Sequence, residues 1–182
     1  MAGLDRVHDR AILDALEGLQ ATPLNATVWR IVRQGRDPLA GALAGGRWSA
    51  AGEIDALYAS LTAEGALAEV GYRLSLEPVW PSKIAHEIHT LRVSAARALK
   101  LDDLELLAKL GVNIARYESF DYAATQAIAA AAHFLEYDAL VVPSARYRGA
   151  NVVVFLDRIA QLPKVMKTQA VDWVEWRGKS KS

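Results

Sequence analysis

Arg47, Tyr58 and Glu69 are the residues of this sequence with the strongest potential for chemistry. Arg47 lies in the segment GGRWS at residues 45–49, where two glycines permit close approach of the backbone to a ligand. Its guanidinium group is a planar fork of donors that suits a phosphate. Glu69 lies in the otherwise apolar segment ALAEV at residues 66–70, where a carboxylate needs a partner or a polar cleft. These residue types indicate a site where an anionic ligand lies beside a carboxylate.

Each of the three residues also has an ordinary structural explanation. Taken alone, residues 45–49 favour a simple turn with a surface arginine, Arg47, stacked on Trp48. Tyr58 lies near the end of an apolar strand, where its ring can belong to the core. A solvated helix face explains Glu69 as well as a functional cleft does. The three residues therefore indicate a functional site only when their positions are considered together.

Ser144 lies in the segment VVPSAR at residues 141–146, at the end of a predicted strand. A serine there can present its hydroxyl group to a cleft, although capping a turn is its commoner role. Because it lacks a G-x-S-x-G context, we exclude a hydrolase nucleophile. The sequence has no cysteine and its four histidines lack zinc-ligand spacing, so we expect no metal site.

Short strands and helices are expected to position these residues. We predict helices over residues 5–19, 62–70 (capped by Ser60 or Thr62), 102–110 (from an Asp102–Glu105 capping box to Gly111) and 121–135 (capped by Asp121). We predict strands over residues 27–32, 56–59, 88–93, 139–142 and 152–156, and a last strand over 171–176 from the alternation of Val171, Trp173 and Trp176. Residues 35–46 and 77–82 are expected to be loops, 143–149 a turn, and the segment from Arg177 a frayed tail. The pattern predicts one α+β domain over residues 23–182, preceded by a helical extension over residues 1–22.

Composition excludes several classes of protein. The 182 residues carry 21 basic and 21 acidic side chains, which gives no global argument for binding nucleic acid or a membrane surface. No apolar run has the length of a signal peptide or of a membrane span. We therefore expect a cytoplasmic protein with no membrane and no direct nucleic-acid contact.

Taken together, the segments resemble the RES domain family, which is named for its Arg, Glu and Ser. The resemblance covers residues 29–158 and consists of WRIV at 29–32, GGRWS at 45–49 with Gly52, LYAS at 57–60, ALAEV at 66–70, YD at 137–138, VPSAR at 142–146, Gly149, Asn151 and VF at 154–155. Each piece alone is weak, whereas their order and spacing are specific. One departure is Ser49, where many members have Asn.

This resemblance implies a toxin of a bacterial toxin–antitoxin pair, with a fold like that of diphtheria-toxin-type ADP-ribosyltransferases. It implies NAD as the substrate, cleaved by hydrolysis or phosphorolysis, with transfer of ADP-ribose to a protein in some members. The implied partner is a cognate antitoxin, a helical protein often with a DNA-binding part, that covers the active site.

Roles for the residues follow as hypotheses from that resemblance. Glu69 would stabilise the positive charge that develops on the ribose as the nicotinamide bond breaks. Arg47 and Arg30 would hold the pyrophosphate or the nearby ribose, although Arg30 is equally suited to pair internally with Glu69. Tyr58 would stack on the nicotinamide ring. Ser144 would hydrogen-bond the nicotinamide side or position a neighbour.

Three alternative functions remain open from the sequence. The nearest is an ADP-ribosyltransferase toxin that modifies a cellular protein. More distant is a non-catalytic module that binds nucleotide or antitoxin, but plain binding does not need the carboxylate of Glu69. A purely structural domain would leave the joint spacing of Arg47, Tyr58 and Glu69 unexplained.

Overall fold

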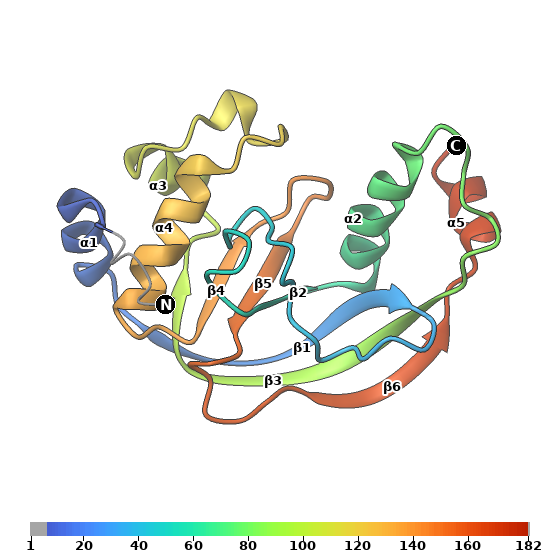
Figure 1. Cartoon of the computed structure of the whole chain (residues 1–182), viewed down its shortest axis with the longest axis horizontal. Helices are drawn as coiled ribbons and strands as arrows, with labels where there is room; N and C mark the ends of the chain where they lie inside the picture. Colours follow the sequence, from blue (N-terminus) through green and yellow to red (C-terminus); the bar gives the residue numbers. More distant parts are fainter. Residues whose placement is uncertain (1–6, 182) are drawn as a thin grey trace.

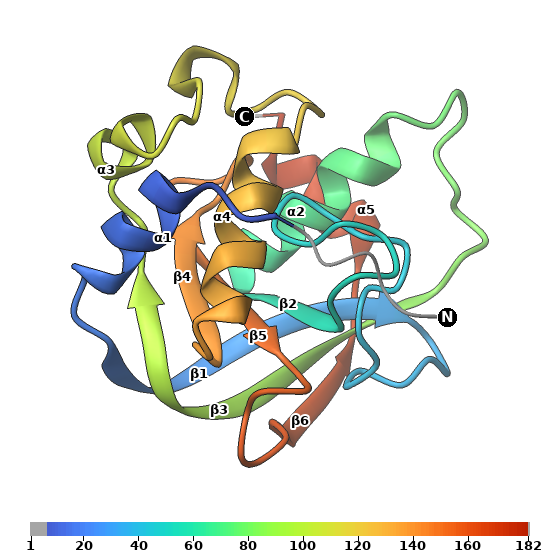
Figure 2. The same ribbon diagram turned by 60° about the vertical axis from the view of Figure 1, so that its left-hand side comes forward.

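The computed structural model describes residues 7–181, which form a closed sheet covered by helices (Figures 1 and 2). The helices are α1 (Arg10–Glu17), α2 (Ala63–Ser75), α3 (Leu104–Lys109), α4 (Ala123–Phe134) and α5 (Trp173–Lys179), with a 3-10 turn η1 (Ile114–Arg116). The strands are β1 (Thr22–Arg33), β2 (Ala56–Ser60), β3 (His86–Lys100), β4 (Ala139–Pro143), β5 (Ala150–Phe155) and β6 (Lys164–Ala170). The predicted mixture of helices and sheet in a single domain is confirmed.

Five of the strands close into a ring, because β1 pairs with a strand at each of its edges. The order β1-β2-β5-β4-β3 returns to β1 through the antiparallel β1–β3 pairing, and β6 adds to β3 outside the ring. The closure between β1 and β2 is narrow, since it consists of the single pair Trp29 and Ser60. The parallel β3–β4 pairing spans only Ala98–Lys100 against Ala139–Val141. Two of the five pairings that close the ring, β1–β2 and β3–β4, are therefore short.

The two faces of β5 bury different halves of the core, as the period of two along a strand requires. Val152 and Val154 pack in one cluster with Val28, Leu57 and other strand residues. Val153 and Phe155 pack in a second cluster, which includes the apolar face of α4. We refer to this second face, which α4 covers, as the outer face of the sheet. Side chains two positions apart on β2, β4 and β5 therefore share that face.

The predicted helices form, with corrections at their ends. Asp9 caps α1, so this helix begins later than expected, and the predicted first residues 5 and 6 lie outside the described residues. Thr62 caps α2 by accepting from the Gly65 N–H, and α2 extends past the predicted end to Ser75. Asp103 rather than Asp102 caps α3, because its side chain accepts from the Glu105 N–H. Tyr122 rather than Asp121 occupies the N-cap position of α4, although Asp121 still accepts from the Ala123 N–H.

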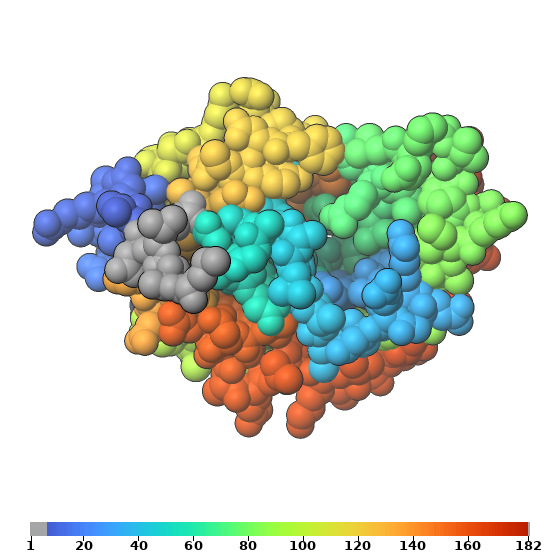
Figure 3. Space-filling view, viewed as in Figure 1, coloured from blue at the N-terminus to red at the C-terminus, as the bar shows by residue number. Residues whose placement is uncertain are grey.

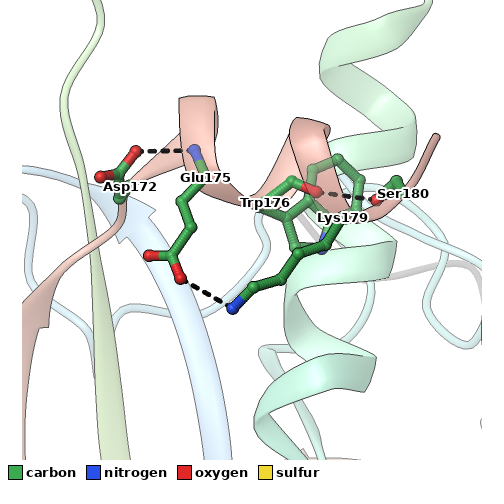
Figure 4. A network of polar contacts seen from close by, with 5 residues as sticks. All are labelled: Asp172, Glu175, Trp176, Lys179 and Ser180. Carbon is green, nitrogen blue, oxygen red and sulfur yellow. Dashed lines mark hydrogen bonds and ion pairs between the residues drawn. The ribbon is translucent and has the colours of Figure 1, made fainter. Parts of the chain in front are cut away.

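The predicted last strand is wrong, because its tryptophans lie on a helix. Asp172 accepts from the backbone N–H of Glu175 and caps α5, and Lys179 pairs with Glu175 at 2.7 Å (Figure 4). Trp173 and Trp176 are three residues apart on one helix face, and both pack in the cluster formed by α2 and β1 residues. The prediction of a frayed tail from Arg177 is also wrong for residues 177–179, because these residues belong to α5.

Helix α5 lies close against α2, and Gly71 makes this approach possible (Figure 1). A Cβ atom at residue 71 would lie 2.2 Å from the Trp176 ring, which is closer than real Cβ atoms approach other groups. The aromatic packing continues from Trp176 to Trp173 and from Trp173 to Trp80. Helix α5 thereby supports the helix that carries Glu69.

Strand β6 was not predicted, and it extends the sheet beyond the ring. It pairs with the first half of β3, from Glu87 against Ala170 to Arg92 against Lys164. All seven of its residues are exposed, so its sequence lacks the half-buried alternation that identifies a strand. The predicted strand over residues 88–93 is likewise the middle of a longer β3.

The proposed boundary at residue 22 remains a prediction. Helix α1, which precedes it, packs against α4, and Leu16 is fully buried in the same cluster as α4. None of the helices within residues 7–181 combines the length and the apolar composition needed to cross a membrane.

Stability should fall below about pH 6.5 because of His86, which lies under α5. His86 is 6% exposed, and its Nδ1 accepts a hydrogen bond from Trp173 Nε1 at 3.0 Å. Burial, and then the positive charge of Arg33, lower the pKa of His86 below its ordinary value. The folded state therefore resists protonation, and its stability is complete above the unfolded pKa of about 6.5 and declines as the pH falls toward the lower folded value.

Urea unfolding of the wild type and of His86→Gln between pH 8 and pH 5 tests this expectation. The wild type should lose more stability than the variant on acidification, because Gln has no proton to gain. A stability difference between the two proteins that stays constant over this pH range contradicts the prediction.

Candidate functional site

A cavity of about 270 Å³ lies on the outer face of the sheet, between α2 and the loop that precedes β2. Figure 3 shows this hollow between residues of that loop, in light blue and turquoise, and α2, in green. Arg30, Arg47, Tyr58 and Glu69 all line the cavity. Four of the five residues predicted from the sequence therefore line one cavity. The fifth, Ser144, is not among the lining residues but donates a hydrogen bond to Glu69.

Glu69 projects from α2 toward the ends of β4 and β5, where two side chains hold one of its oxygens. Its Oε1 accepts hydrogen bonds from Ser144 Oγ at 2.6 Å and from Asn151 Nδ2 at 2.9 Å. Its Oε2 accepts no hydrogen bond from any residue between 7 and 181. The carboxylate thus has one anchored oxygen and one oxygen available to a ligand in the cavity.

Ser144 is oriented by its own turn. Its Oγ accepts from the backbone N–H groups of Arg146 at 3.2 Å and Tyr147 at 3.1 Å. A hydroxyl group has two acceptor lone pairs and a single proton, so these two bonds direct the proton toward Glu69. Of the two roles expected for Ser144, the geometry corresponds to positioning a neighbour, namely Glu69.

Arg47 connects the loop at residues 45–49 to the segment before α4. Its Nη1 donates to the Tyr117 carbonyl and its Nη2 donates to the Ser119 carbonyl at 3.2 Å. Its Cζ lies 4.8 Å and 4.7 Å from the ring centroids of Tyr117 and Tyr122. These contacts hold a cation at the wall of the cavity. Its other N–H groups donate to no acceptor among residues 7–181 and can bind a ligand.

The hydroxyl group of Tyr58 organises the same loop. It accepts from the Trp48 N–H at 3.0 Å and shares a 2.8 Å hydrogen bond with Ser49 Oγ. A Cβ atom at residue 46 would lie 2.8 Å from this hydroxyl oxygen, so Gly46 permits the close approach. Burial raises the pKa of Tyr58, which keeps the hydroxyl group protonated at neutral pH.

Removal of the Tyr58 hydroxyl should destabilise the protein by about 1–3 kcal/mol, because the Trp48 N–H would lose its partner in a half-buried position. Thermal unfolding of Tyr58→Phe measures this loss, and hydrogen exchange at the Trp48 amide should become faster. Tyr147→Phe is the matched control, since the Tyr147 hydroxyl makes no hydrogen bond within the described part of the chain. Equal unfolding temperatures for the two variants contradict the prediction.

Arg30 lies in the cavity wall, and its guanidinium group donates hydrogen bonds to backbone carbonyl groups. Its Nη1 donates to the Tyr58 carbonyl and its Nη2 to the Ala40 carbonyl, both at 2.8 Å, and its Nε is buried without a partner in the described residues. Burial lowers the pKa of Arg30 from its ordinary value. The alternative pairing with Glu69 is not formed, because no ion pair joins Arg30 to Glu69 within residues 7–181.

The described residues that line the cavity are strongly cationic. They include four arginines, Arg30, Arg47, Arg73 and Arg146, and one carboxylate, Glu69. No group of three or more potential metal ligands occurs among residues 7–181. The arrangement can therefore bind a polyanion and place a carboxylate oxygen beside it.

Sequence reasoning assigned no role to several residues of the site, among them Asn151 and Arg146. Asn151 donates to Glu69, and Arg146 lines the cavity with its Cζ 3.7 Å from the Tyr72 ring centroid. A polar side chain at the edge of the apolar run VVVF in residues 152–155 was the available signal for Asn151. Arg146 lies two residues after Ser144, in the same turn, which was the signal for it.

Comparison with known proteins agrees with the resemblance seen in the sequence. The model of the RES domain matches residues 27–174. The M. tuberculosis MbcT-MbcA toxin-antitoxin complex contains a chain of similar fold, with a TM-score of 0.83, 20% sequence identity, and coverage of 96% of this chain and 99% of that chain. No curated protein matches the sequence. Because the RES domain model spans most of the sequence, this protein belongs to the RES domain family.

Proposed function

We propose that this protein is a toxin of a bacterial toxin–antitoxin pair that cleaves NAD at the bond between nicotinamide and ribose. One observation carries the proposal above all others. Glu69 has a carboxylate oxygen with no hydrogen bond from the described residues, in a cavity whose other charged lining residues are all arginines. NAD combines an anionic pyrophosphate with a ribose that becomes positively charged during cleavage, and these two parts match the arginines and the carboxylate.

In the proposed reaction, the bond between ribose C1′ and the nicotinamide nitrogen breaks, and its electron pair leaves with nicotinamide. The ribose then resembles an oxocarbenium ion, as in the cleavage of other glycosidic bonds. Oε2 of Glu69 stabilises this charge, because it is fixed beside the ribose before the charge develops. Water or phosphate then attacks C1′ and loses a proton, which yields ADP-ribose or its 1-phosphate.

Arginines and Tyr58 hold the substrate in this proposal. Arg47 and Arg30 lie on the cavity wall and face the pyrophosphate or the adjoining ribose. Arg47 is the stronger candidate, because Arg30 already donates to two carbonyl groups. The ring of Tyr58, anchored through its hydroxyl group, provides an aromatic surface for nicotinamide. We further propose that the closed sheet and its cavity correspond to the diphtheria-toxin-type ADP-ribosyltransferase fold.

Nicotinamide release from NAD by the purified protein tests the proposed activity. We expect turnover in buffer without phosphate if water is the acceptor, and only in phosphate buffer if phosphate is the acceptor. Incubation with labelled NAD and cell lysate tests for a protein acceptor. A labelled protein band would favour the alternative, an ADP-ribosyltransferase that modifies a cellular protein. Absence of turnover under all of these conditions, with NAD still bound, would leave a non-catalytic binding module and overturn the proposal.

We also propose a cognate antitoxin, with a DNA-binding helical part, as the protein partner in the cytoplasm. The mouth of the cavity supports this, since Phe120 and Leu76 line it and are 62% and 52% exposed. The M. tuberculosis protein of similar fold is part of a toxin-antitoxin complex. A helical protein encoded by an adjoining reading frame should inhibit nicotinamide release, and Phe120→Glu should weaken that inhibition. Inhibition that is equally strong for the variant contradicts this placement of the partner.

A further inference from the structure

Ser60, Asn151 and Glu69 form a chain of hydrogen bonds across the outer face of the sheet. Ser60 Oγ donates to Asn151 Oδ1 at 2.9 Å, and Asn151 Nδ2 donates to Glu69 Oε1 at 2.9 Å. Ser60 and Asn151 are direct partners in the register of β2 and β5. Ser60 is 3% exposed, so its hydroxyl group is removed from water. A buried hydroxyl with this placement requires a partner, and the amide of Asn151 supplies it.

Only one orientation of the Asn151 side-chain amide satisfies its hydrogen bonds to both Glu69 and Ser60. The carboxylate of Glu69 is an acceptor, so the NH₂ end of the amide must face it. The oxygen end then needs a donor, which Ser60 provides from the neighbouring strand. The reversed amide would place Oδ1 against Oε1, where two oxygen atoms would repel each other. Ser60 and Asn151 thus present a donor to Glu69 from a rigid pair of strands.

A single hydrogen bond would leave the carboxylate of Glu69 free to rotate about its Cγ–Cδ bond. Ser144 contacts Oε1 from the turn after β4, and Asn151 contacts the same oxygen from β5. Two donors from two elements fix both the position of Oε1 and the plane of the carboxylate. The remaining oxygen, Oε2, is thereby directed to one place in the cavity.

We propose that Asn151, oriented by Ser60, is a positioning residue that aims Oε2 of Glu69 at the reacting ribose. This inference rests on the proposed function. Displacement of a catalytic group by about 1 Å can lower a rate by about a hundredfold. We therefore expect Asn151→Ala to lower kcat by about 10- to 100-fold with little change in KM, since the arginines that hold the substrate are untouched. Ser60→Ala should lower kcat less, and Ser60→Thr should restore it by returning a hydroxyl donor.

A matched control lies elsewhere in the sheet. Ser94 Oγ donates to Asn25 Oδ1 at 2.9 Å, and these residues are also direct partners on adjacent strands, β3 and β1. Asn25→Ala removes the same kind of hydrogen bond away from the cavity and should leave kcat unchanged. If Asn151→Ala behaves like Asn25→Ala, the proposal is overturned. A rise in KM with constant kcat also overturns it, because Asn151 would then bind the substrate directly.

A second measurement tests the contact without any turnover of NAD. In Asn151→Asp, two carboxylates would face each other, and their repulsion is relieved when a proton is shared at low pH. The melting temperature of this variant should lie further below that of the wild type at pH 8 than at pH 5. Asn25→Asp, which faces Ser94, should show no such difference. If the deficit of Asn151→Asp is the same at both pH values, the contact with Glu69 is refuted. If the pH effect is present but wild-type protein releases no nicotinamide, the proposed function fails and the assigned purpose of the contact fails with it.

Discussion

Glu69→Gln should lose nicotinamide release by about 100-fold or more, because it removes the charge that we propose stabilises the oxocarbenium ion. Glutamine has nearly the same shape and keeps an oxygen that can accept from Ser144 and Asn151. The fold should therefore remain intact. Since the lost interaction belongs to the transition state, kcat should fall far more than KM rises.

Steady-state kinetics with both proteins, together with circular dichroism and thermal unfolding, separate loss of chemistry from loss of fold. Glu64→Gln is a matched control, because Glu64 is an exposed carboxylate in the first turn of the same helix. This control should retain activity. A Glu69→Gln protein with wild-type kcat contradicts the role given to the carboxylate.

Asp138→Ala should produce the largest loss of stability among the substitutions considered. Asp138 is 5% exposed, and its two carboxylate oxygens accept from the backbone N–H groups of Ala96 at 2.8 Å and Arg97 at 3.0 Å. Both donors belong to β3, next to its short parallel pairing with β4. Without the carboxylate, two N–H groups would be left without partners where the ring closes.

Each of the two hydrogen bonds to the charged Asp138 carboxylate contributes about 1.5–3 kcal/mol, so the loss should be about 3–6 kcal/mol. For a chain of this size, this corresponds to a decrease in melting temperature of about 6–24 °C. Asp138→Asn, which keeps one acceptor oxygen, should lose roughly half as much. Differential scanning calorimetry of the three proteins measures the effect. A decrease below about 2 °C for Asp138→Ala would show that other groups satisfy the β3 backbone.

Local signals in the sequence were sufficient for most of the elements near the site. The short apolar run at residues 56–59 predicted β2, and Thr62 with the following residues predicted the start of α2. The strand that carries Tyr58 and the helix that carries Glu69 were thus both predicted from local signals, whereas the common site of the two residues was proposed from the resemblance. The ordered motifs also predicted the RES domain family, which the family model confirms.

Local signals failed where the environment of a segment decided its structure. Strand β6 is fully exposed, so neither face carries an apolar pattern, and only its pairing with β3 makes it a strand. The segment from Val171 to Trp176 is so short that its apolar residues fit both the two-residue period of a strand and the 3.6-residue period of a helix. Capping by Asp172 and packing of Trp173 and Trp176 against the cluster beside α2 select the helix.

The sequence by itself determined the residue types of the site and the strand–helix unit that carries Tyr58 and Glu69. It could not determine how the carboxylate is held, because the donors to Glu69 come from Ser144 and Asn151, which lie 75 and 82 residues further along the chain. Arg47 likewise reaches Tyr117 and Ser119 across a distance in sequence of 70 and 72 residues. Such contacts depend on which strands pair when the ring closes, and strand pairing follows from burial of the whole core rather than from any local pattern.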